Sequence, residues 1–207
     1  MKMNGIPPMK TFAKRTFSLP LLARSLAAAT VHLPVLMVAL IRPATSRALR
    51  EKVMLAVSSV NDCRYCNWVH TGLALAKGVD LDELQQVLDH GTFGKLGSRD
   101  ATAILFAQHF AATARQPTAD ARAALAREFT AYQRAEIMSY VHGIYFLNLT
   151  GNSYDAWLAR FAGQKVESGH PAAEAMAAIL LAPALALVRL CSGASFLKPP
   201  AGSKGSK

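Results

Sequence analysis

Cysteine, aromatic and acidic residues are all scarce in this 207-residue sequence, and each scarcity narrows the class of protein. Of the three cysteines, two form a C-x-x-C pair, which suits a reducing compartment where such a disulfide is transient. We therefore expect a cytoplasmic protein. Aromatic residues make up only 8% of a chain that is 52% hydrophobic, and no long stretch alternates strictly between apolar and polar residues. This Ala- and Leu-rich composition predicts an all-α protein with one domain.

Acidic residues number 13 against 23 lysines and arginines, so the chain carries a formal net charge of +10. An excess of this size raises the question of a nucleic-acid or membrane-surface partner. Much of it lies near the two ends of the chain, at Lys2, Lys10, Lys14, Arg15, Lys198, Lys204 and Lys207. Because no interleaving of basic and aromatic residues resembles a nucleic-acid module, we interpret these charges as solvated arms and expect no nucleic-acid partner.

Three segments are expected along the chain: a flexible basic arm over 1–17, a helical domain over 18–165, and over 166–207 an apolar helix (about 171–190) with a disordered basic tail. The last helix is wholly apolar from Ala175 to Val188. An oligomer interface is its expected environment, and membrane contact is the less favoured alternative. The third cysteine, Cys191, is expected to be structural or incidental.

A second apolar stretch, from Leu19 to Ile41, follows basic residues and resembles a signal peptide or membrane span in composition. Arg24, His32 and Pro34 interrupt it. We interpret it as one or two packed helices kinked at Pro34, with membrane association or export as the alternative.

Further helices are expected from Arg99 to Arg115 behind a Ser98 cap, and from Ala135 to Leu149 and Asn152 to Ala162 around a turn at Gly151. The histidines at 32, 90, 109 and 170 are expected to be packing or surface residues. His142 and Asn152 are secondary candidates for positions beside a functional site.

The most informative stretch runs from Glu51 to His70 and includes Cys63 and Cys66. At about 100° per residue, the two cysteines and the histidine fall within roughly 60° of one another on a helix. Asn61 and Asp62 are good N-caps, so Cys63 should lie near the first helical position, where the helix dipole lowers a thiol pKa. The preceding helix, expected over about 46–60, can fold back and bring Glu51 to His70.

These groups favour redox chemistry, although two alternatives remain. Helical neighbours at this spacing have Cβ atoms about 5–6 Å apart, whereas a disulfide needs about 3.8 Å. A bond between them is therefore strained and easily reduced, which suits a cycling disulfide. The same residues, Cys63, Cys66, His70 and Glu51, could instead hold zinc, or the cysteines could be inert. A c-type haem site is excluded because Asn67, not histidine, follows Cys66.

The E-x11-C-x2-C-x3-H pattern resembles the signature of the AhpD-like, or carboxymuconolactone decarboxylase, family. The likeness extends from about Leu19 to Gly163 and includes Phe146-Leu-Asn-Leu-Thr-Gly-Asn152. It implies an all-helical homo-oligomer, a trimer or hexamer, that depends on an external dithiol such as a lipoyl or thioredoxin-like protein. Some peroxidase members have a second histidine where this chain has Tyr65. Decarboxylase members generally lack the cysteine pair, so lactone decarboxylation is disfavoured.

By this resemblance Cys66 attacks the peroxide, Cys63 protonates the leaving group and resolves to the disulfide, and Glu51 and His70 form a proton relay. The helix dipole by itself favours Cys63 as the more acidic thiol, so the two arguments disagree on which sulfur attacks first. The sequence thus predicts a thiol-dependent alkyl hydroperoxide reductase that needs no cofactor and no metal. The alternative is a non-catalytic redox sensor or a zinc-binding protein of the same fold.

Overall fold

The computed structural model describes residues 11–88 and 97–192, with the side chains of the last helix described as far as Pro183. Within these residues the chain forms eight helices and one short sheet, so the all-α prediction is confirmed. The helices are α1 Leu19–Ile41, α2 Arg47–Val60, α3 Arg64–Ala76, α4 Leu81–Leu88, α5 Ser98–Ala112, α6 Ala119–Glu128, α7 Ala131–Phe161 and α8 Pro171–Ser192. The sheet pairs β1 Thr11–Phe12 with β2 Lys165–Val166 in parallel.

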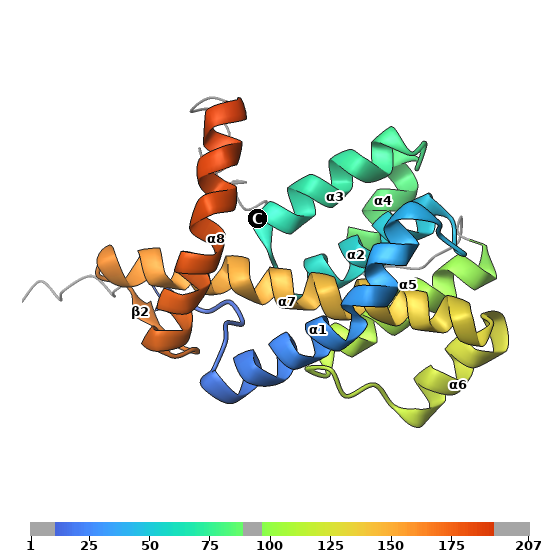
Figure 1. Ribbon diagram of the computed structural model, residues 1–207, viewed down its shortest axis with the longest axis horizontal. Helices are drawn as coiled ribbons and strands as arrows, with labels where there is room; N and C mark the ends of the chain where they lie inside the picture. The colour runs from blue at the N-terminus through green and yellow to red at the C-terminus, as the bar shows by residue number, and fades with distance from the viewer. Residues whose placement is uncertain (1–10, 89–96, 193–207) are drawn as a thin grey trace, which may run out of the picture.

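Helix α7 is the element around which the others are arranged (Figure 1). It begins at a capping box in which Thr130 and Gln133 exchange side-chain and backbone hydrogen bonds. Helices α1, α2, α3 and α8 all pack against it, and its apolar face supplies much of the core. The largest of its fully buried residues are Tyr140, Tyr145, Ile137, Ile144 and Leu149.

The predicted turn at Gly151 is wrong, because α7 continues through this residue without a break. Glycine usually weakens a helix, which is why the sequence suggested a boundary here. In the structure a Cβ at this position would lie 3.2 Å from Cys63 Sγ and 3.3 Å from the Tyr65 ring. Gly151 therefore serves close packing between α7 and the segment that carries the cysteines.

The predicted flexible arm over 1–17 is wrong for residues 11–17, which are tied to the body of the protein. β1 pairs with β2, and the Phe17 side chain is completely buried. Arg15 donates to the backbone oxygen of Ala111 at the C-terminal end of α5. Residues 1–10 and the predicted disordered tail beyond residue 192 lie outside the described residues, and so does His90.

Helix α5 ends at Ala112, three residues before the predicted end, since Ala114 and Arg115 have left-handed backbone conformations. Its N-cap is Gly97, not Ser98, and Gly97 has no side chain that could bond the first turn. These differences are confined to the two ends of α5, which packs against α2.

Helix α1 is continuous from Leu19 to Ile41 with Pro34 inside it. Among the described residues it is the one helix long and apolar enough to cross a membrane, judged by length and composition alone. Only 11% of its most apolar window is buried in the protein. Four leucines at intervals of seven, Leu19, Leu26, Leu33 and Leu40, are each between 43% and 48% exposed. One side of α1 packs on α7, and the other presents an apolar surface.

Candidate active site

The turn between α2 and α3 places the cysteines. Asn61 ends α2, and Asp62 takes a left-handed conformation with φ of 52°. The predicted caps, Asn61 and Asp62, do not begin the next helix, because Cys63 itself is the N-cap of α3. Its Sγ accepts a hydrogen bond from the Cys66 backbone N–H at 3.4 Å. A thiol is a weak acceptor and a thiolate a stronger one, so this position favours negative charge on Cys63.

Glu51 and His70 meet as the motif predicts. Helix α2 packs against α3, and Glu51 Oε2 lies 2.8 Å from His70 Nδ1. Arg50, which the sequence analysis did not single out, binds the other carboxylate oxygen with its Nη2 2.7 Å from Glu51 Oε1. Burial alone would raise the pKa of Glu51, which is 1% exposed, but the hydrogen bonds from His70 and Arg50 outweigh it and lower that pKa. The residue is therefore a buried carboxylate that orients the imidazole.

The two thiols differ in acidity and in accessibility. The Cys66 thiol donates to Cys63 Sγ, and this hydrogen bond is the largest cause of a lowered pKa at Cys63 and a raised pKa at Cys66. Cys63 is fully buried, whereas Cys66 is partly exposed. The more acidic sulfur is thus the less accessible one. The helix dipole favours Cys63 for its acidity, whereas the family resemblance favours attack by Cys66, which is the more exposed of the two.

Cys66 and His70 open on the same cavity, which has a volume of about 180 Å³. Its walls come from α3, α7 and α8 and are largely apolar. They consist of Tyr65, Cys66, Val69, His70, Ile144, Leu147, Gly151 and Leu181. A small molecule in this cavity therefore meets one thiol, one imidazole and a surrounding hydrocarbon surface.

Asp155 on α7 holds the segment between the cysteines, and sequence analysis missed it. Tyr65 donates to Asp155 Oδ1 at 2.8 Å, and Arg64 Nη2 lies 2.7 Å from the same oxygen. The Arg64 guanidinium also stacks on the Tyr65 ring, 4.6 Å from its centre. Burial, then the Asp155 charge, raises the pKa of Tyr65, so this phenol is protonated at neutral pH. No local pattern could reveal a pair separated by 90 residues in the chain.

Asn152 supports the turn from behind. Its Nδ2 donates to the backbone oxygens of Asn61 at 2.7 Å and Arg15 at 3.1 Å. This secondary candidate therefore lies beside the site, as a structural support. His142 lies elsewhere, stacked on His32 with ring centres 4.4 Å apart and against the edge of Phe110.

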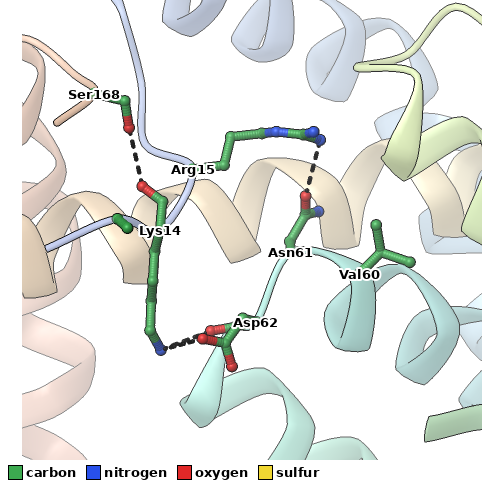
Figure 2. A pocket seen from close by; sticks show the side chains of 7 residues that line it. Lys14, Arg15, Val60, Asn61, Asp62 and Ser168 are labelled. Atoms are coloured by element: carbon green, nitrogen blue, oxygen red, sulfur yellow. Dashed lines mark hydrogen bonds and ion pairs between the residues drawn. The ribbon is translucent and has the colours of Figure 1, made fainter. Parts of the chain in front are cut away.

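A second cavity, of about 610 Å³, adjoins the turn that precedes Cys63 (Figure 2). Lys14 reaches across it to Asp62, with its Nζ 3.1 Å from Oδ2 and 2.8 Å from the backbone oxygen. The Lys14 charge lowers the pKa of Cys63, and the Asp155 charge raises it. Two opposite charges from distant parts of the chain thus act on the same sulfur.

The fold and the site define an all-α protein with a hydrogen-bonded C-x-x-C pair next to a histidine that is hydrogen-bonded to a carboxylate. Residues 24–109 match a family model described as "Carboxymuconolactone decarboxylase family", so the chain contains a domain of this family, as its motif predicted. The matched segment includes all four motif residues, Glu51, Cys63, Cys66 and His70. No curated protein and no solved structure matches the chain. Within the described residues, no three His, Cys, Asp or Glu side chains are grouped as a metal site.

Proposed function

We propose that this protein is a thiol-dependent alkyl hydroperoxide reductase that cycles through a Cys63–Cys66 disulfide. The observation that carries the proposal is the arrangement at Cys66. This sulfur lines an apolar cavity together with His70, and its thiol is hydrogen-bonded to the more acidic Cys63. The cysteine pair in a domain of this family favours thiol redox chemistry over lactone decarboxylation.

The first half-reaction begins with transfer of the Cys66 proton to the Cys63 thiolate along their hydrogen bond. Cys66 then attacks the terminal oxygen of the hydroperoxide, the O–O bond breaks, and Cys66 becomes a sulfenic acid. The departing alkoxide takes the proton from Cys63 and leaves as an alcohol. Acidity at Cys63 and attack by Cys66 are compatible in this scheme, because the buried sulfur acts as the base for the accessible one.

In the second half-reaction the Cys63 thiolate attacks the Cys66 sulfur and displaces hydroxide, which becomes water with a proton delivered through His70. An external dithiol then returns two electrons and two protons to the disulfide. Per cycle, one hydroperoxide and one dithiol become one alcohol, one water and one oxidised dithiol. A lipoyl or thioredoxin-like protein is the proposed donor.

Glu51 and His70 act as the proton relay in this proposal. Because His70 directs Nδ1 at Glu51, its Nε2 is the nitrogen available for proton exchange in the cavity. Glu51 stabilises the protonated imidazole, and Arg50 keeps the carboxylate ionised. The relay therefore exchanges a proton with the reacting groups without itself entering a bond to substrate.

We also propose that the protein is a homo-oligomer in the cytoplasm. The exposed apolar residues of α1 are surfaces that a second copy of the chain can cover. Size-exclusion chromatography with light scattering tests this point, since a monomer at micromolar concentration contradicts it.

The decisive experiment combines thiol titration with mass spectrometry on the reduced protein. Treatment with cumene hydroperoxide should remove two free thiols per chain and yield a disulfide that joins residues 63 and 66. Cys66→Ser should abolish turnover with dithiothreitol, and Cys191→Ser, the matched control, should retain it. Full activity in Cys66→Ser would contradict the assignment of the attacking sulfur.

The same preparation separates the proposal from its two alternatives. Slow reaction with every peroxide, combined with a change of assembly on oxidation, favours a redox sensor. Stoichiometric zinc in elemental analysis favours a metal-binding role.

A further inference from the structure

Helix α8 lies outside the segment that matches the family model, yet it reaches the cavity at Cys66. Its first turns are firmly attached to α7. Glu174 is fully buried and forms a two-point ion pair with Arg160, with Nε to Oε2 at 2.5 Å and Nη2 to Oε1 at 3.0 Å. Ala173 and Ala177 are also completely buried. The first turns of α8 are therefore anchored to α7 by an ion pair and by buried alanines.

The next turns of α8 stand away from the body of the protein (Figure 1). Ile179 is 73% exposed and Leu180 is 57% exposed. Leu181 is the exception, since it is half-buried and lines the cavity with Cys66 and His70. The attachment at Glu174 holds this single side chain over the site.

Most of the cavity wall around the thiol and imidazole is hydrocarbon. Ile144, Leu147, Val69 and Leu181 contribute it from three helices. Leu147 is 52% exposed and Val69 is 40% exposed, so water covers part of this wall when the cavity is empty. A bound apolar group displaces that water and gains free energy, whereas hydrogen peroxide has no group that can cover the wall.

We propose that Leu181 is a specificity-determining residue that makes the cavity select hydroperoxides with an apolar alkyl or aryl group over hydrogen peroxide. This inference rests on the proposed function. The peroxide oxygens lie at Cys66 and His70, and the apolar group lies between Leu147 and Leu181. Helix α8, which lies outside the family match, thus determines which substrates reach Cys66 and His70, which lie within the match.

The test compares Leu181→Ala with Ile179→Ala, a control on the same helix that does not line the cavity. With cumene hydroperoxide, kcat/KM of Leu181→Ala should fall about tenfold, the usual scale for loss of apolar pocket contacts. With hydrogen peroxide it should stay within about twofold of the wild-type value. Ile179→Ala should leave both values unchanged. Leu181→Met, which conserves volume, should retain the wild-type preference for cumene hydroperoxide over hydrogen peroxide.

Equal losses on both peroxides in Leu181→Ala, or an unchanged ratio, would overturn the inference and leave the proposed function intact. A second measurement does not need turnover. The product alcohol, 2-phenyl-2-propanol, should slow alkylation of Cys66 by iodoacetamide, and Leu181→Ala should need about tenfold more alcohol for the same protection. Protection that depends on Leu181 in a protein without peroxidase activity supports the assignment of the wall and contradicts the proposed function alone.

Discussion

The site has an α2–α3 half and an α7–α8 half, and the two are built from different kinds of residue. The first half contributes two sulfurs, an imidazole and a buried carboxylate, all within the segment that matches the family model. The second half contributes apolar side chains, the close approach at Gly151 and one carboxylate, Asp155. These residues all follow residue 109, where the match ends.

The two halves therefore have different roles: the first supplies the reactive groups, and the second shapes the cavity and the charge around them. Groups that exchange protons must be within hydrogen-bonding distance. The first turn of α3 provides that closeness for the two cysteines, and the packing of α2 on α3 provides it for Glu51 and His70. The shape of the cavity and the charge around Cys63 depend instead on how α7 and α8 pack over the motif. Substitutions in the two halves should therefore have distinct signatures, and the following experiments test that expectation.

The largest effect is expected from Glu51→Gln in the first half. Loss of the carboxylate charge leaves the protonated form of His70 without its partner, so we expect kcat/KM for cumene hydroperoxide to fall about 100-fold. Glu83→Gln, which removes a carboxylate paired with Lys52 on another face, is the control and should stay near wild-type activity. A loss of less than threefold in Glu51→Gln would contradict the relay.

In the α7–α8 half, Gly151→Val should lower the free energy of unfolding. The new side chain collides with Cys63 and Tyr65, and overpacking of this kind typically destabilises by about 1–3 kcal/mol. Gly72→Ala on α3 is the matched control, since nothing lies within 4 Å of its Cβ position. It should stabilise by about 0.5–1 kcal/mol through helix propensity. Chemical denaturation measures both changes, and a Gly151→Val variant as stable as wild type would refute the packing account.

Asp155→Asn tests the influence of the second half on the first. Removal of a negative charge should lower the pKa of Cys63, because the Asp155 carboxylate raises it. Lys14→Gln should move the same pKa upward, because the Lys14 charge lowers it. Thiolate absorbance against pH measures both shifts. Shifts in the same direction would show that altered packing, not charge, is responsible.

The smallest effect on activity is expected from substitution of His142, which belongs to neither half of the site. Burial, with the charges of His32 and Arg115, lowers its pKa to about 4, below the unfolded value near 6.5. The unfolded chain therefore binds the proton more readily, and stability should fall as pH decreases from 6.5 toward 4. His142→Phe should flatten this pH dependence in denaturation experiments without changing the pH profile of activity. A changed activity profile would indicate coupling between this stacked pair and the site.

Local sequence was sufficient wherever neighbours along the chain interact. Ser46 caps α2 and Thr118 caps α6, because the side chain of an N-cap accepts a hydrogen bond from a backbone amide two or three residues ahead. The spacing of Glu51 and His70 indicated that they meet, since α2 and α3 are joined by a short turn. The same rules failed at Cys63, which took the cap position itself.

Wherever distant segments meet, only the packed chain decided the outcome. Gly151 suggested a turn but instead packs closely against Cys63. Residues 11–17 were expected to be mobile but are held in place by pairing with β2 and by burial of Phe17. Asp155 accepts a hydrogen bond from Tyr65, and Leu181 lines the cavity with Cys66, each across 90 residues or more of the chain. Spacing along one or two helices determined which reactive groups gather. Burial of side chains from α7 and α8 determined what surrounds them, because such contacts form only when the helices fold onto one another.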